Sequence, residues 1–372
     1  MTGAVDEKLR RKYRILVAPL DWGLGHATRC IPVINELVSN DCEVWVAAEG
    51  SQEILLKKEF PSLSFLSLTG YRIRYSKRAT WFAFKILLQV PTIIATIRTE
   101  HRWLKKMIDS FHFDAIISDN RFGLYDSNIP SVFITHQLNV KTPFGRWSER
   151  VLRKWNYKYI NRFGECWIPD LPGVVNLAGQ LSHPDTLPRI PARYIGILSR
   201  FEKNKSTEIK DHLLILLSGP EPQRTIFENK IVNEISHYAG TATIVRGLPL
   251  ASSIIPSTGM IKFYNHVPAK ELNEEMQHAE WVIGRSGYST VMDIVALQKK
   301  SILIPTPGQT EQEYLAKNLL SKKTAFCVDQ NEFSLTNAIS QAKNFNFQFP
   351  DTGNSNQLKS TVKHFLEKLP QS

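Results

Sequence analysis

Short apolar runs alternate with segments of helical spacing along the first half of the chain. The apolar runs are rich in β-branched residues and fall at 14–19, 43–48, 65–68, 115–118 and 132–135. The helical segments between them fall at 31–38, 52–58 and 81–108, and the last one contains Pro91. This alternation is typical of a parallel sheet with helical crossovers. It predicts an α/β domain over residues 1–200, with one or two helices at 81–108, interrupted at Pro91.

The alternation restarts after 169–207, a region rich in proline, glycine and polar residues. Strands are predicted at 213–217, 242–246, 261–264, 281–283 and 301–304, and helices at 225–238, 268–277, 290–297 and 312–320. A last segment, 358–369, also has helical periodicity. We therefore predict a second α/β domain at 201–355, and a C-terminal helix within 356–372 that packs back on the first domain.

Composition places the chain among ordinary globular proteins. It has 372 residues, of which 42% are hydrophobic and 22% charged, enough to bury a sizeable core. The four cysteines (Cys30, Cys42, Cys166 and Cys327) include no C-x-x-C pair, which argues against a disulfide scaffold and a zinc site. A reduced, cytoplasmic protein is expected.

No segment has the pattern of a membrane span or a secretory leader. The longest apolar stretch, 81–97, is interrupted by Lys85, Gln89 and Pro91, whereas a spanning helix needs about 20 mostly apolar residues. The polar N-terminus leads into an apolar run that is too short for a signal peptide. We expect a protein that is not integral to the membrane.

Charge is unevenly distributed along the chain. The formal net charge is +11, and residues 1–200 carry 28 basic against 18 acidic side chains, a net of +10. Two segments hold most of the excess: 71–106 has nine basic residues and one acid, and 141–162 has seven and one. Such an asymmetry indicates an anionic partner, namely nucleic acid, a phosphorylated substrate or a membrane surface.

The first candidate site is the glycine-rich loop that follows the first predicted strand. Gly23 and Gly25 allow a ligand to approach the backbone at a helix N-terminus. With Glu49 further along, they form an incomplete dinucleotide fingerprint. His26 lies inside this loop, where a histidine can act as a base on a substrate hydroxyl. The alternative is a histidine that caps the helix or packs against the sheet.

A second glycine-rich turn joins the predicted strand 281–283 to the helix at 290–297. Arg285, Ser286 and Gly287 form this turn, which predicts an anion site at a helix N-terminus with an added cation. Asp293 lies one turn into the helix, where a carboxylate can reach ribose hydroxyls. The alternative for Asp293 is complementation of the helix dipole.

Two further loops carry polar groups suited to a nucleotide or a sugar. Ser218 and Gly219 follow the first strand of the second domain, where they can approach a phosphate or form a plain turn. Gln309, Gln312 and Glu313 follow the strand at 301–304. Amides and carboxylates form directed hydrogen bonds to several hydroxyls, as sugar recognition requires.

Taken together, these motifs resemble the GT-B glycosyltransferases. Gly23-x-Gly25-His26, Gly284-Arg-Ser-Gly-Tyr-Ser-Thr-x-x-Asp293 and Pro305-x-x-x-Gln309-x-x-Gln312-Glu313 carry the resemblance, which extends in order from residue 14 to 320. Within that fold the chain is most similar to the family 28-like cell-wall N-acetylglucosaminyltransferases, which act on a lipid-linked acceptor. The resemblance implies two Rossmann-like domains that face each other across a cleft, and a hexosyltransferase-type activity in cell-envelope polysaccharide synthesis.

The resemblance also implies roles for the motif residues. The second domain would bind a UDP-sugar as substrate, and no cofactor is implied. Asp293 would hold the ribose, and the turn 285–287 would lie near the pyrophosphate. The backbone of Val267 would contact uracil, and Gln312 and Glu313 the donor sugar. Asp293 replaces the family's usual glutamate and Glu313 its second glutamine, so the identity of the donor sugar stays open. The segment ending at Arg200 lacks two of the family's residues.

Features of the first domain fit this implied reaction. Asp119 ends the strand at 115–118 and His136-Gln137 ends the next one, and open α/β sheets bind ligands at these strand ends. Asp119 can orient His26 or stabilise its charge; a solvated loop acid is the alternative. The sequence contains no D-x-D motif. We therefore expect no metal, with helix N-termini and Arg285 stabilising the leaving UDP.

The basic segments 71–106 and 141–162 interleave cations with aromatic and aliphatic residues. Such mixtures suit an anionic membrane surface, where a lipid-linked acceptor would be met. We expect peripheral attachment to the cytoplasmic face of the membrane and no nucleic-acid partner, since no nucleic-acid-binding motif accompanies the charges. The alternative is a set of ordinary solvated helices.

Three hypotheses of function follow, in order of preference. The first is an inverting, metal-independent glycosyltransferase in which His26 deprotonates the acceptor hydroxyl. The second is a UDP-sugar hydrolase of the same fold, because Gly-x-Gly-His-x-x-Arg-Cys at 23–30 is also similar to the hydrolase of pseudaminic acid synthesis. The third is a non-catalytic nucleotide or nucleic-acid binding protein. A nicotinamide enzyme is disfavoured by the second nucleotide motif.

Overall fold

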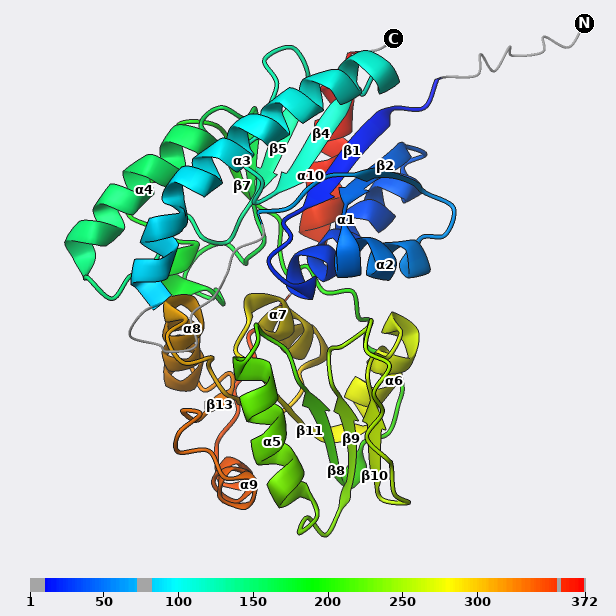
Figure 1. The fold of residues 1–372 in the computed structure, drawn as a ribbon, viewed down its shortest axis with the longest axis vertical. Helices are drawn as coiled ribbons and strands as arrows, with labels where there is room; N and C mark the ends of the chain where they lie inside the picture. The colour runs from blue at the N-terminus through cyan, green and yellow to red at the C-terminus, as the bar shows by residue number, and fades with distance from the viewer. Residues whose placement is uncertain (1–10, 72–81, 353–355, 371–372) are drawn as a thin grey trace, which may run out of the picture.

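Two parallel α/β sheets, one in each half of the chain, organise the molecule (Figure 1). The computed structural model describes residues 11–71, 82–352 and 356–370. The strand order is β3-β2-β1-β4-β5-β6-β7 in the first sheet and β10-β9-β8-β11-β12-β13 in the second. All registered strand pairs are parallel. Two Rossmann-like domains that face each other are the GT-B architecture, so the predicted fold class is confirmed.

The inner strands of the first sheet, β1, β4, β5 and β6, are almost completely buried. Its strands are β1 (Arg14–Pro19), β2 (Glu43–Ala48), β3 (Ser64–Ser67), β4 (Ala115–Asp119), β5 (Ser131–Ile134), β6 (Glu165–Ile168) and β7 (Ala192–Tyr194). Its helices are α1 (Leu24–Ser39), α2 (Gly50–Glu59), α3 (Phe82–Phe111) and α4 (Arg146–Ile160). Helices cover both faces of the sheet, which explains why its strands are continuous apolar runs. The carboxyl ends of β1, β4 and β5 point toward the second domain (Figure 1).

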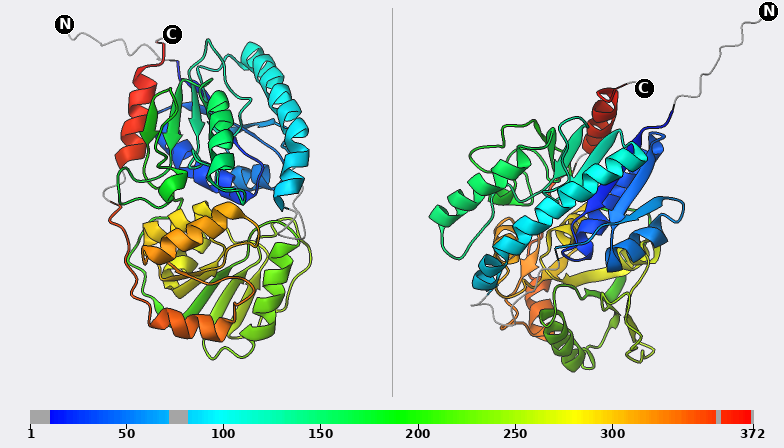
Figure 2. Two further views of the ribbon diagram at one scale, coloured as in Figure 1. Left: turned by 90° about the vertical axis from the view of Figure 1, so that its left-hand side faces the viewer. Right: turned by 45° about the horizontal axis from the view of Figure 1, so that its top comes forward.

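The second sheet has the same construction. Its strands are β8 (Ile209–Leu216), β9 (Thr241–Val245), β10 (Ile261–Tyr264), β11 (Ala279–Gly284), β12 (Ser301–Leu303) and β13 (Phe326–Cys327). Its helices are α5 (Gln223–Ile235), α6 (Ala269–His278), α7 (Tyr288–Leu297), α8 (Thr310–Ser321) and α9 (Leu335–Lys343). Helices α7 and α8 lie on the side of the second domain that faces the first domain (Figure 2, left).

Some elements differ from those predicted. The interruption expected at Pro91 is wrong, because α3 is one helix that passes through this residue. Helix α4 and strands β6 and β7 were not predicted. The sequence of α4, RWSERVLRKWNYKYI, is amphipathic, but its apolar positions are mostly aromatic and lie among charged residues. Strand β7 has only three residues, which are too few to show a periodicity.

The last helix, α10 (Asn356–Glu367), crosses back to the first domain (Figure 2, left). The ring of Phe365 meets the edge of Trp167 on β6, with 5.5 Å between ring centroids. Lys368 donates to Glu165 at the start of the same strand, at 2.7 Å. Among the described residues, no helix combines the length and the hydropathy that a bilayer span requires.

Phe365→Ala should lower the free energy of unfolding by about 3–5 kcal/mol, the usual cost of removing a buried aromatic ring. Phe365 is 3% exposed, and its loss leaves Trp167 without its edge contact. Chemical denaturation followed by tryptophan fluorescence measures the change. Lys363→Ala, on the exposed side of the same helix, is the matched control. Equal stability of the two variants would contradict the docking of α10.

Candidate active site at the domain junction

The two domains contact each other directly at the carboxyl end of the first sheet. Ser289, in the first turn of α7, donates its hydroxyl to the carbonyl of Gly25 at 2.8 Å. A Cβ added at Gly25 would lie 2.9 Å from that hydroxyl oxygen, so the close approach requires glycine here. Gly23, at the N-cap of α1, has a φ of 85°, a conformation that favours glycine. The glycines of the loop thus shape the junction.

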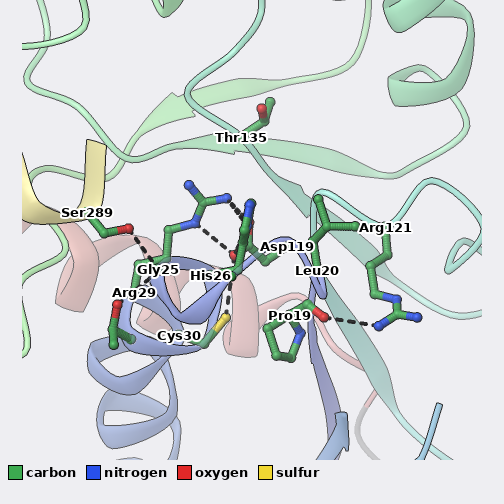
Figure 3. A network of polar contacts seen from close by, with 12 residues as sticks. Pro19, Leu20, Gly25, His26, Arg29, Cys30, Asp119, Arg121, Thr135 and Ser289 are labelled. Atoms are coloured by element: carbon green, nitrogen blue, oxygen red, sulfur yellow. Dashed lines mark hydrogen bonds and ion pairs between the residues drawn. The ribbon is translucent and has the colours of Figure 1, made fainter. Parts of the chain in front are cut away.

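A buried polar cluster lies immediately behind this contact (Figure 3). His26 and Arg29 are one turn apart on α1 and converge on Asp119, the last residue of β4. The Arg29 Nε donates to Asp119 Oδ2 at 2.7 Å, and its Nη2 donates to the second carboxylate oxygen. The Nδ1 of His26 lies 3.1 Å from Asp119 Oδ2. The structure brings the predicted residues His26 and Asp119 into contact; the sequence analysis quoted Arg29 within a motif but gave it no role.

The cluster controls the protonation of its members. Burial alone would raise the pKa of Asp119, but Arg29 and His26 outweigh burial and hold this pKa at about 2. Burial first, and then the charge of Arg29, lower the pKa of His26 below its ordinary 6.5, against the opposing influence of Asp119. His26 is therefore neutral at pH 7 and able to accept a proton.

The Nδ1 of His26 has two competing partners. When it carries the proton it donates to Asp119, and the lone pair is on Nε2. When it is unprotonated it accepts from the Arg29 Nη2, 2.7 Å away, and the proton is on Nε2. Only the first tautomer leaves Nε2 free to act as a base.

A second histidine extends the cluster to the other domain. The Arg29 Nη1 lies 3.1 Å from the Nδ1 of His136, beyond the end of β5. Arginine only donates, so this Nδ1 accepts and the proton is on Nε2. That N–H donates to Glu311 of the second domain at 2.8 Å. Glu311 also accepts from the Gln137 amide, and the His136 ring stacks on Tyr288 with centroids 4.2 Å apart.

Arg29, His136 and Glu311 thus join the predicted His26–Asp119 pair into one chain across the junction. Sequence reasoning placed His136 at this edge but gave no role to Arg29 or Glu311. The signal for Arg29 is its spacing, since residues three apart on a helix share a face. Glu311 lies inside the Gln309–Glu313 motif, in the first turn of α8, where carboxylates favour the helix N-terminus.

The residues predicted to hold the nucleotide lie together in the second domain but bond mainly to the protein. Asp293 is 9% exposed and accepts from the Ser199 hydroxyl at 2.7 Å. Burial raises the pKa of Asp293 to about 6, opposed by nearby Arg200. Sequence reasoning could assign this arginine only from an incomplete motif; the structure brings it beside Asp293.

The residues predicted to contact the donor sugar form a network of their own. Gln312 donates to the Oε1 of Gln309 at 2.5 Å and accepts from the backbone N–H of Thr306 at 2.9 Å. Glu313 accepts from the backbone N–H of Gly308 at 2.8 Å. Ser286 donates its hydroxyl to the backbone carbonyl of Gln312, again at 2.9 Å, which ties the turn before α7 to α8.

Arg285 differs most from its predicted position. Its side chain is 1% exposed, its Nη2 donates to the carbonyl of Gln223 at 2.8 Å, and its guanidinium lies 4.6 Å from the centroid of Phe227. Burial lowers the pKa of Arg285 to about 10. In this structure its charge is directed at backbone carbonyls inside the domain, not at the junction.

The remaining predicted residues lie around this network. Ser218 and Gly219 are exposed at the turn after β8, where Gly219 has a φ of 101°. Val267 is buried, 7% exposed, in the core that both domains share. Gly287 is the N-cap of α7. Among the described residues, no group of three histidine, cysteine or carboxylate side chains is arranged to hold a metal ion.

Comparisons with known proteins agree with this architecture. Residues 261–369 match the glycosyltransferase family 28 C-terminal domain. A curated relative from Francisella philomiragia subsp. philomiragia is 25% identical over 344 residues, 85% of this chain and 84% of the relative. It is named UDP-N-acetylglucosamine–N-acetylmuramyl-(pentapeptide) pyrophosphoryl-undecaprenol N-acetylglucosamine transferase. An uncharacterized glycosyltransferase of Methanosarcina mazei is 23% identical and covers 81% of both chains.

Solved structures show the same fold over almost the whole length. The glycosyltransferase of kitacinnamycin superposes with a TM-score of 0.59 and 13% identity, covering 96% of this chain and 95% of that one. The calicheamicin glycosyltransferase CalG4 superposes with a TM-score of 0.59 and 12% identity, covering 96% and 99%. At this identity the likeness concerns the fold alone.

Arg29→Gln should raise the pKa of His26, because the arginine charge is the second largest influence that lowers it. The imidazole resonance of His26, followed by NMR over a pH series, measures the pKa directly. Arg29→Lys keeps a charge at this position and should give a smaller rise. Circular dichroism checks that both variants fold. An unchanged His26 pKa in a folded Arg29→Gln variant would contradict the coupling.

Proposed function

We propose that this glycosyltransferase, in which residues 261–369 match the family 28 C-terminal domain, transfers a sugar from a UDP-sugar to an acceptor hydroxyl. The acceptor we propose is lipid-linked or membrane-associated. The observation that carries the proposal is the junction itself. His26 and Asp119 lie at the carboxyl edge of the first sheet. Arg29 and His136 connect them to Glu311, inside the Gln309–Glu313 motif of the second domain. The name of the Francisella relative, with a UDP-sugar and an undecaprenol-linked acceptor, supports the substrate classes.

The proposed reaction is a single displacement. In the tautomer that donates Nδ1–H to Asp119, the Nε2 of His26 accepts the proton of the acceptor hydroxyl. The oxygen then forms a bond to the anomeric carbon, while the bond from that carbon to the diphosphate oxygen breaks and UDP leaves. One displacement inverts the anomeric configuration. Asp119 stabilises the imidazolium that forms, as carboxylates do in other acid–base pairs.

The donor half of the proposal rests on the second domain. Asp293 would accept hydrogen bonds from the ribose, in exchange for its bond to Ser199. Gln312 and Glu313 would contact the sugar, and Val267, Ser218 and Gly219 the nucleotide. The turn at Ser286 and Gly287 presents the N-terminus of α7, whose backbone N–H groups favour the diphosphate and the negative charge of departing UDP. We propose that this occurs without a metal ion or cofactor.

The membrane half of the proposal rests on α4 and the loop before it. Phe144 and Trp147 are 73% and 76% exposed, beside the cations of a helix that contains Arg146, Arg150, Arg153, Lys154 and Lys158. Exposed aromatic rings among cations suit an anionic bilayer surface, at about 1 kcal/mol per well-placed cation. Part of the other basic segment, 72–81, lies outside the described residues. We propose peripheral attachment to the cytoplasmic face through these segments.

Transfer is favoured over hydrolysis because the matched family is one of glycosyltransferases and the Francisella relative is named a transferase. The exposed basic and aromatic surface of α4 also has no use in a hydrolase of soluble substrates. The two activities give different products, glycosylated acceptor or free sugar, from the same UDP-sugar.

His26→Ala should lower kcat by about 10²–10⁴-fold, the usual contribution of a general base, and change the affinity for UDP less than twofold. Turnover of UDP-N-acetylglucosamine with a polyprenyl-diphosphate sugar acceptor and with water alone measures the first quantity. His237→Ala, an exposed histidine of the second domain, is the matched control. Equal losses of kcat and of UDP affinity would make His26 a binding residue.

Asp293→Ala should weaken UDP binding about tenfold or more, because a hydrogen bond to a charged group contributes about 1.5–3 kcal/mol. Calorimetric titration with UDP in the presence of a metal chelator measures the affinity, with ADP and NAD as comparison ligands. Ser199→Ala removes only the hydroxyl that donates to Asp293 and should bind UDP like the wild type. Unchanged affinity in Asp293→Ala would overturn the assignment of the ribose.

A further inference from the structure

Helix α8 presents a stripe of polar side chains to the main chain of the first domain (Figure 2, left). Residues four apart lie on one face of a helix. The α8 stripe consists of four such residues, the last at the C-cap: Thr310, Tyr314, Asn318 and Lys322. At the start of the helix, the Thr310 hydroxyl donates to the backbone carbonyl of Lys141 at 2.8 Å. The stripe therefore begins on the loop before α4.

The rest of the α8 stripe lies along the segment 176–180 of the first domain. The Tyr314 hydroxyl accepts from the backbone N–H of Gln180 at 2.8 Å. Asn318 and Lys322 donate to backbone carbonyls of the same segment, also at 2.8 Å. Every member of the stripe thus bonds to a main-chain atom of the first domain, over the whole length of the helix.

The segment 176–180 is fixed from inside the first domain. The carboxylate of Asp170 is completely buried and accepts from the backbone N–H groups of Leu177 and Ala178 at 2.8 and 3.0 Å. It also accepts from the Ser182 hydroxyl at 2.5 Å. Because these bonds are internal to the first domain, α8 docks on a surface that is already ordered, which lowers the entropic cost of docking.

A glycine allows α8 to come this close. A Cβ added at Gly179 would lie 2.5 Å from the hydroxyl oxygen of Tyr314 and 3.0 Å from the Oδ1 of Asn318. Gly25 has the same relation to Ser289 of α7, at 2.9 Å. Each of the two helices thus meets a glycine of the first domain at a point where a larger residue would not fit.

The α8 stripe begins inside the turn whose residues are proposed to contact the donor sugar. Thr310 and Glu311, which bond to the first domain, lie between Gln309 and Gln312 in the sequence. Gln312 also accepts from a backbone N–H of the second domain. The turn is therefore held by both domains. Asp293, which is proposed to hold the ribose of UDP, is on α7 and lies outside this turn.

We propose that the first domain, through the α8 stripe, positions the side chains that recognise the donor sugar. The inference rests on the proposed transfer reaction and extends it, because it makes selection of the sugar a task of both domains. Hydrogen bonds to sugar hydroxyls depend on direction as well as distance, so a displacement of α8 weakens them. In the proposed site UDP contacts α7 and the turns beside it, so binding of UDP does not depend on the stripe.

One test removes hydroxyls from α8 with little change of shape. Thr310→Val/Tyr314→Phe deletes the two hydroxyls that bond to the first domain. Thr310→Ser keeps the first of these hydroxyls and should behave like the wild type. Lys317→Ala changes an exposed side chain of the same helix and is the matched control.

A second test approaches α8 from the first domain. Gly179→Ala places a methyl group against the Tyr314 hydroxyl, but it also strains the backbone, since the φ of Gly179 is 55°. Gly173→Ala is the control for this strain. Gly173 has a φ of 80°, and among the described residues no atom other than those of its chain neighbours lies within 4 Å of an added Cβ.

Two measurements on the full chain separate docking from recognition. Hydrogen–deuterium exchange of residues 309–313 reports the docking of α8. Calorimetric titration compares UDP with whichever of UDP-N-acetylglucosamine and UDP-glucose the wild type binds more tightly. In Thr310→Val/Tyr314→Phe and in Gly179→Ala we expect faster exchange and about tenfold weaker binding of the UDP-sugar, since hydrogen bonds of ordinary strength are lost. Binding of UDP should stay within twofold of the wild type, and the control variants should match the wild type in both measurements.

The outcomes distinguish this inference from the function on which it rests. Unchanged exchange would mean that the stripe does not hold α8. Faster exchange with unchanged affinity for the UDP-sugar, or with equal losses for UDP and the UDP-sugar, would mean that the stripe does not position the sugar contacts. Each of these results overturns the inference and leaves the transfer reaction standing. If the wild type binds neither UDP nor a UDP-sugar, the proposed function is wrong and the inference falls with it.

Discussion

The buried ion pair between Arg29 and Asp119 is the interaction on which the junction of the two domains depends. Arg29 is 2% and Asp119 0% exposed, so each charge would be costly without the other, and removal of one partner from such a pair costs about 3–5 kcal/mol. The pair joins α1 to β4, and through its remaining N–H groups Arg29 also orients His26 and His136. One guanidinium thus connects the proposed base, the sheet edge and the contact with Glu311.

This arrangement links the position of the second domain to the electrostatic environment of His26 in the first domain. Glu311 reaches His136 only when α8 lies against the end of β5. The Nδ1 of His136 accepts a hydrogen bond from the Nη1 of Arg29. The Nε and Nη2 groups of Arg29 remain for Asp119 and His26. If the domains separate, the carboxylate of Glu311 is withdrawn from the cluster. In this structure the charge of Glu311 is therefore part of the electrostatic environment of His26.

Sequence patterns were sufficient where local periodicity and strand order determine the outcome. Strand β10 has the bounds that its apolar run predicts. The pairing of β1 with β4 brings His26 to Asp119, because parallel strands end at the same carboxyl edge of the sheet. Sequence patterns were insufficient where a side chain contacts residues that are distant in the chain. The inward turn of Arg285 depends on the carbonyl of Gln223 and the ring of Phe227. No spacing along the chain encodes those contacts.

The distribution of charge separates two tasks between the domains. If the excess of cations served to bind the donor diphosphate, it would lie in the second domain. Residues 1–200 instead carry +10 of the +11, and many of these cations are on α3 and α4. In the second domain Arg285 is bonded to carbonyls, so in the proposed reaction the backbone N–H groups at the N-terminus of α7 would meet the departing diphosphate. A backbone dipole is fixed in place and needs no mobile cation, so the proposed reaction makes no demand on the cations of α3 and α4.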